Sequence, residues 1–169
     1  MRMAALVMAI FIAFESPALA RKVLHPTYAQ LMKESDLVVI VHALETRPAK
    51  DGDSIVPVDH GPDYLTPIIT TFEVLAVMKG TQDSKTLELC HYKYKPDGPG
   101  VLNGPLLVWF PTRDDDVIQH RDRRGAWTIT VPTEFVLFLR RDDEGRLTFV
   151  TGQFDAEPSV KQMHDPFPF

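Results

Sequence analysis

The sequence predicts a mainly β protein: a small antiparallel β-barrel with one short helix near its N-terminus, with a β-sandwich as the alternative. The chain has 169 residues, enough for one hydrophobic core and too few for two full-sized domains. Fourteen prolines interrupt any long helical pattern. Val, Ile, Thr and Phe gather in short runs, as they do in strands. A barrel is favoured because closure removes exposed sheet edges.

Composition narrows the class of protein further. Hydrophobic residues make up 44% and charged residues 24% of the chain, which is typical of a globular domain and excludes a disordered or fibrous one. The net charge is −5. We expect no nucleic-acid partner, because Lys and Arg dominate affinity for phosphate backbones.

Residues 1–20 are predicted to be a secretory signal peptide. Arg2 supplies an early positive charge, an apolar stretch covers 3–14, and small residues at the end of the segment precede a cleavage point after Ala20. The apolar stretch is shorter than the roughly 20 residues of a membrane-spanning helix. The mature chain would begin at Arg21, which is not a lipid-anchoring cysteine. We therefore expect an exported protein, periplasmic or secreted, without a membrane anchor.

The first half of the mature chain predicts a helix and three strands. Thr27 is a plausible N-cap for a helix of two to three turns that ends near Ser35. In the run 37–44, the side chains expected on both faces of a strand are mostly apolar, as in a strand that is covered on both faces. A Pro- and Gly-rich loop over 46–67 follows it. Strands are then expected over Ile68–Val77 and Lys85–Tyr94, joined as an antiparallel hairpin.

The second half predicts shorter strands around a charged excursion. The expected strands are 106–110, 126–131, 134–140 and 146–150. The last two form a second hairpin through Asp142-Asp143-Glu144-Gly145. The charged excursion covers 113–125. The domain organisation is thus a signal peptide (1–20), a single β-barrel domain (21–155) and a Pro-rich C-terminal tail (156–169).

The chain resembles a known group of barrels in three segments. The pattern of hydrophobic residues resembles that of the OB-type barrels of the netrin-like group in Glu34–Val41, Thr71–Gly80 and Glu134–Leu139. That group includes the tissue inhibitors of metalloproteinases and many exported bacterial proteins without assigned roles. The resemblance implies an OB-like barrel over 34–155. In the inhibitors an N-terminal cysteine sits over the target's zinc, whereas this chain has only Cys90. Inhibition by that mechanism is therefore not carried over.

Two tyrosines and two residues of the charged excursion are the candidate ligand-binding residues. Tyr92 and Tyr94 lie two apart in a predicted strand, between lysines, so their rings share one face and are suited to stacking on a flat ligand. The alternative is that both rings pack against the long loop. Arg113 and His120, in the charged excursion, complete the candidate set.

Asp114 and Asp116 are the candidate metal ligands. Carboxylate oxygens suit Ca²⁺, and an exported protein meets that ion. The run 114–116 lacks the glycine and the alternating acidic positions of a helical calcium loop. A solvated loop that pairs its own equal numbers of Arg and Asp is the alternative interpretation. No other cofactor is expected.

No recognised nucleophile or metal-protease motif occurs in the chain. The leading prediction is an exported, non-enzymatic module that binds an extracytoplasmic protein or small ligand through the loops 46–67, 96–104 and 113–125. The alternative is an extracytoplasmic hydrolase, metal-dependent or carboxylate-based. It would use residues from the set His42, His91, His120 and 114–116. Convergence of these side chains in one pocket distinguishes the two.

Overall fold

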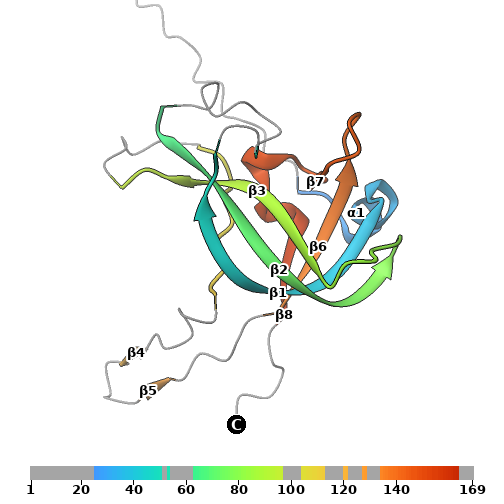
Figure 1. The fold of residues 1–169 in the computed structure, drawn as a ribbon, viewed down its shortest axis with the longest axis horizontal. Helices are drawn as coiled ribbons and strands as arrows, with labels where there is room; N and C mark the ends of the chain where they lie inside the picture. Colours follow the sequence, from blue (N-terminus) through green and yellow to red (C-terminus); the bar gives the residue numbers. More distant parts are fainter. Residues whose placement is uncertain are drawn as a thin grey trace, which may run out of the picture.

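One antiparallel sheet organises this computed structural model, which describes residues 25–50, 53, 63–96, 104–112, 120–121, 127–128 and 134–163 (Figure 1). Its strands are β1 (Leu37–Pro48), β2 (Leu65–Lys79), β3 (Thr86–Tyr94), β6 (Glu134–Arg141), β7 (Leu147–Phe149) and β8 (Val160–Met163). The order is β3-β2-β1-β6-β7, and β8 pairs with β6 beside β7. A separate short ladder joins β4 (His120–Arg121) to β5 (Trp127–Thr128). The prediction of a mainly β fold is confirmed.

The single α-helix of the described residues begins where the sequence predicts. In α1 (Tyr28–Glu34), the Thr27 hydroxyl accepts a hydrogen bond from the Gln30 main chain, and the Gln30 side chain accepts one from the Thr27 main chain. At the other end, the Lys79 ammonium donates to carbonyl oxygens of Met32 and Ser35, where a cation is favourable. These contacts fix α1 against the end of β2.

Long, bent strands carry the sheet. β1 pairs with β2 on one side and with β6 on the other, and its register against β2 shifts three times along its length. Such shifts bend a strand and increase its twist. β1 and β2 accordingly sweep across the molecule as arcs (Figure 1).

The two faces of the sheet bury different clusters. The inner face holds most of the core, and its aromatic centre consists of Phe72, Phe110, Phe135 and Phe149. On the other face, under α1, a smaller cluster contains Leu31, Val38, Phe138 and Val150. The alternation of strand side chains therefore explains why the run 37–44 is apolar at successive positions.

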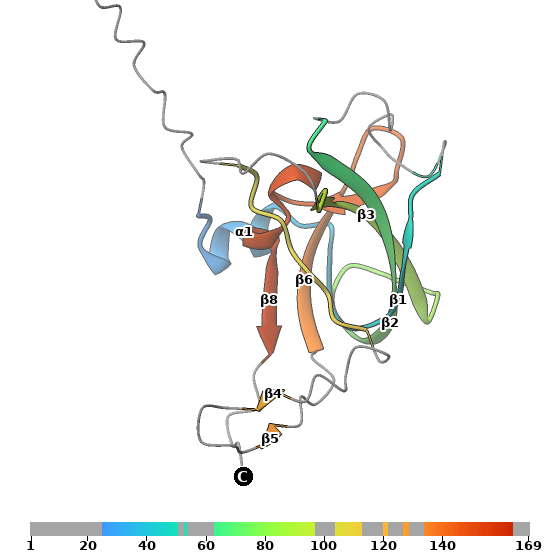
Figure 2. The same cartoon turned by 90° about the vertical axis from the view of Figure 1, so that its left-hand side faces the viewer.

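Residues 104–112 correct the sequence prediction. The expected strand 106–110 is an extended segment without strand pairing (Figure 2). Pro105 and Pro111 flank it, and proline has no main-chain N–H to give to a ladder. The strand prediction is therefore wrong for this segment, in which Phe110 is buried and Trp109 is exposed.

The sheet gains one more strand after residue 155, within the stretch expected to be a Pro-rich tail. After η3 (Gln153–Asp155) and η4 (Glu157–Ser159), β8 joins the sheet by pairing with residues 134–137 of β6. Only Val160 and Met163 are apolar in this four-residue strand, too few for a clear alternating pattern. Residues 164–169 of the expected tail, and most of the expected strand 126–131, lie outside the described residues.

Gly80, at the turn after β2, is expected to be intolerant of a side chain. Its φ is +82°, and a Cβ there would overlap the carbonyl oxygen of Asp36. Gly145 has a similar φ of +79° with open space around it, so Gly145→Ala measures the left-handed penalty alone, about 1 kcal/mol. We expect Gly80→Ala to lower the free energy of unfolding by about 1–2 kcal/mol more. Equal losses in urea unfolding of the two variants would contradict the close packing of Gly80.

Candidate functional site: a groove beside β3

Of the predicted site residues, the structure places the side chains of Tyr92 and Tyr94. Arg113, Asp114 and Asp116 lie outside the described residues, and His120 is described only as part of β4. The calcium hypothesis and all four candidate ligand contacts therefore stay predictions.

The two tyrosines border a groove of about 530 Å³. It is lined by Thr46, Ile68, His91, Tyr92, Lys93, Tyr94, Pro105, Leu106, Leu107, Val108, Trp109, Phe110 and Glu157. This volume falls within the range of small-molecule sites, roughly 300–1,000 Å³. The lining is mostly apolar, so the groove favours ligands with apolar or aromatic groups.

The tyrosines have different roles in the wall of the groove. Tyr92 is 1% exposed, and its ring stacks on Phe154 of η3 with centroids 4.6 Å apart. Tyr94 is 44% exposed, stacks on Tyr64, and donates its hydroxyl to the carbonyl oxygen of Pro105 at 2.9 Å. The sequence placed both rings on one face correctly, but it gave no sign that η3 covers the first. Tyr94 is the ring open to a ligand.

The segment 105–110 forms another wall of the groove, and none of its residues is among the site residues predicted from the sequence. The Leu106 N–H donates to the Asp155 carboxylate, and the Leu106 carbonyl accepts from the Glu157 N–H. Phe110 inserts into the aromatic core, whereas its neighbour Trp109 is 63% exposed. A tryptophan within a proline-bounded apolar run is the sequence signal that points to this segment.

His91 lies in the floor of the groove and is buried. Its Nε2 is 2.8 Å from the Thr70 hydroxyl, which is itself 2.8 Å from the Thr46 hydroxyl. The rings of Phe110 and Phe149 pack edge-on against the imidazole. Burial lowers the pKa of His91 to about 4. The imidazole is therefore neutral at pH 7 and contributes no positive charge to the groove.

His42 does not converge with His91. The register places His42 on β1 between Glu73 of β2 and Glu134 of β6. It alternates with the core residues Val41 and Ala43, so it faces away from the cluster that contains His91. Among the described residues, no three His, Cys, Asp or Glu side chains are grouped to hold a metal ion.

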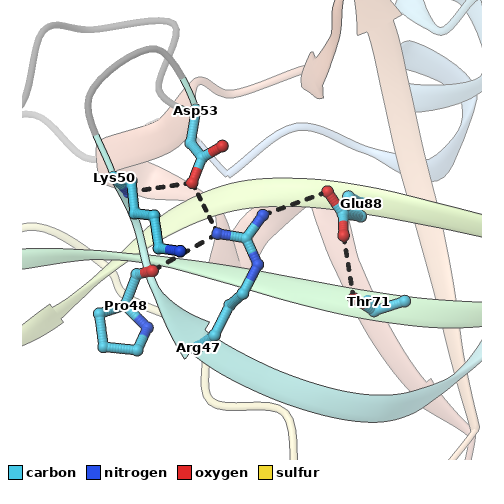
Figure 3. A network of polar contacts seen from close by, with 6 residues as sticks. All are labelled: Arg47, Pro48, Lys50, Asp53, Thr71 and Glu88. Atoms are coloured by element: carbon cyan, nitrogen blue, oxygen red, sulfur yellow. Dashed lines mark hydrogen bonds and ion pairs between the residues drawn. The ribbon is translucent and has the colours of Figure 1, made fainter.

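A polar network lies outside the groove, where β1 leaves the sheet (Figure 3). Arg47 donates to the Asp53 carboxylate at 2.6 Å and to the Glu88 carboxylate at 3.4 Å. The hydrogen bond from Arg47, with one from the Lys50 N–H, holds the pKa of Asp53 below its ordinary value. All these groups are solvent-accessible and paired among themselves, so the network orders the start of a loop and exposes no isolated charge.

Comparison with known proteins assigns neither a family nor a function to this chain. No family model, characterised protein or solved structure matches this chain. Within the part of the chain that the structure describes, no helix is both long and apolar enough to cross a bilayer.

The groove has a largely apolar lining suited to binding, with several polar side chains among its described residues. The Tyr94 hydroxyl is held by Pro105, and the neutral His91 is held by Thr70; the other polar side chains of the lining are Thr46, Tyr92, Lys93, Trp109 and Glu157. Nucleophilic catalysis needs a hydroxyl, thiol or amine within hydrogen-bonding reach of a base. The Thr70 hydroxyl meets His91 below the surface, where both are buried.

Proposed function

We propose that this chain is an exported, non-enzymatic binding module that holds an extracytoplasmic protein or small ligand in the groove beside β3. The observation that carries the proposal is the exposure of Trp109 and Tyr94, which line one apolar groove from two separate segments of the chain. Aromatic side chains that are solvated in the free protein and enclosed in a complex dominate many binding interfaces. The proposal includes no cofactor and no nucleic acid.

Two opposite charges support a ligand of mixed polarity. Lys93 extends from β3 and Glu157 from η4, so they flank the groove from different elements. Neither makes an ion pair with another described side chain. Each is thus able to pair with a charge on a bound molecule, which favours orientation more than affinity.

For the fold, we propose the OB-like closed barrel that the resemblance implies. β3 and β7 are the ends of the sheet, and successive antiparallel pairings make them run in the same direction. A pocket of about 190 Å³ is lined from both sides, by Cys90 of β3 and Leu147 of β7 among others. Adjacent parallel ends are what closure of this strand order requires.

Export is expected to leave a mature chain that begins at Arg21. The reason is the apolar segment 3–14, followed by small residues up to Ala20. Expression of the full sequence in a bacterium with a secretion system, followed by N-terminal sequencing of the extracytoplasmic fraction, measures this. A first residue of Met1, or recovery only from the cytoplasm, would contradict export.

The binding site is tested with indole as a small aromatic probe. We expect saturable amide shifts in two-dimensional NMR at Lys93, Tyr94 and the segment 105–110, lost in Trp109→Ala. Tyr28→Ala is the matched control, because Tyr28 is an equally exposed aromatic residue on α1 that does not line the groove. Shifts centred instead on the exposed Leu75 and Met78 would overturn the proposed site.

A further inference from the structure

The main chain of the groove wall has groups without a hydrogen-bond partner among the described residues. Residues 107–110 form no main-chain hydrogen bond with any other described residue, although the preceding Leu106 is bound at both its N–H and its carbonyl. The segment is extended, as a strand is. Unpaired N–H and C=O groups in a row are a template for a further strand. The wall therefore offers main-chain recognition as well as apolar contact.

The opposite wall is also the end of a sheet. Among the described strands β3 pairs only with β2, and its residues 92–94 line the groove. A chain lying in the groove would thus run between two extended segments. Side chains of such a chain alternate in direction, so every second one would meet Trp109 and Tyr94.

We infer that the ligand is an extended peptide of a partner protein, which adds as a strand to the main chain of residues 107–110 and places apolar or aromatic side chains between Trp109 and Tyr94. The inference rests on the proposed function and names its ligand class. Strand addition takes affinity from main-chain hydrogen bonds and specificity from alternate side chains. Lys93 and Glu157 would favour peptides that carry both charges.

The experiment uses a displayed library of random linear peptides of about nine residues. Selection on the native chain is followed by counter-selection on the double variant Tyr94→Ala, Trp109→Ala. The enriched sequence is synthesised, and each amide is N-methylated in turn. We expect every second methylation to weaken binding about tenfold or more, because only alternate amides of a strand face its neighbour. The intervening methylations should change affinity less than about twofold.

Each outcome bears on a different claim. The alternating pattern, with loss of binding in Trp109→Ala but not in Tyr28→Ala, supports strand addition. Peptides that bind with a flat N-methylation profile overturn strand addition and leave the groove as the site. Failure to enrich any peptide, while indole still binds at the groove, overturns a peptide as the ligand class. Failure of indole to bind there contradicts the proposed function itself.

Discussion

Replacing Phe110 by alanine is expected to lower the free energy of unfolding by about 3–5 kcal/mol, as truncation of a fully buried aromatic residue does. Its ring lies 4.8 Å from that of Phe72, 5.2 Å from that of His91 and 5.0 Å from that of Phe135, centroid to centroid. Urea unfolding followed by circular dichroism measures the loss. We expect this large effect because the Phe110 ring packs against the inner face of the sheet, although Phe110 belongs to no strand.

Trp109→Ala is the matched control for Phe110→Ala. The two residues are neighbours and both aromatic, but Trp109 is 63% exposed. We expect Trp109→Ala to change the free energy of unfolding by about 0.5 kcal/mol or less. A loss for Phe110→Ala as small as this would mean that the segment 104–112 does not pack on the core.

The second large effect is a loss of stability in acid caused by His91. Its pKa is about 4 in the folded chain, against 6.5 for an exposed histidine. Between these values the unfolded chain binds a proton that the folded chain excludes, so stability is fully present above pH 6.5 and decreases as the pH falls. The contribution lost by pH 4 is about 3 kcal/mol.

Comparison with His91→Gln separates this contribution from that of the carboxylates. The glutamine amide cannot titrate, and the two chains share all their other titratable groups. From pH 7 to pH 4, the free energy of unfolding of the native chain should therefore fall by about 3 kcal/mol more than that of the variant. An NMR titration of the His91 ring gives its pKa directly. A midpoint near 6.5 would show that the imidazole is solvated, and would contradict its burial between Phe110 and Phe149.

Local signals in the sequence predicted much of the sheet. Thr27 was placed as a helix cap, and both hairpins were predicted, because capping and alternation act over a few residues. β8 was missed because a four-residue strand with little apolar alternation is stabilised by its partner β6. The strand expected over 106–110 is absent because an apolar run can place Phe110 in the core without strand pairing, which Pro105 and Pro111 disfavour.

The groove was only half predictable. Spacing placed Tyr92 and Tyr94 on one face, but the burial of Tyr92 depends on η3, which lies about 60 residues further along the chain. The wall that carries Trp109 comes from a different segment again. Contacts of this kind depend on tertiary packing, which no local pattern encodes. For the same reason, the sequence alone does not show that His42 and His91 lie on opposite faces of the sheet.

Amide hydrogen exchange of the free protein tests the central claim most directly, because it needs no ligand. The claim is that the groove wall carries unpaired main-chain groups beside a stable core. We predict rapid exchange at Leu107 and Trp109, and slow exchange at Leu89 and His91 in β3. Protection of Leu107 and Trp109 equal to that of β3 would mean that the wall is already paired, and would contradict the claim.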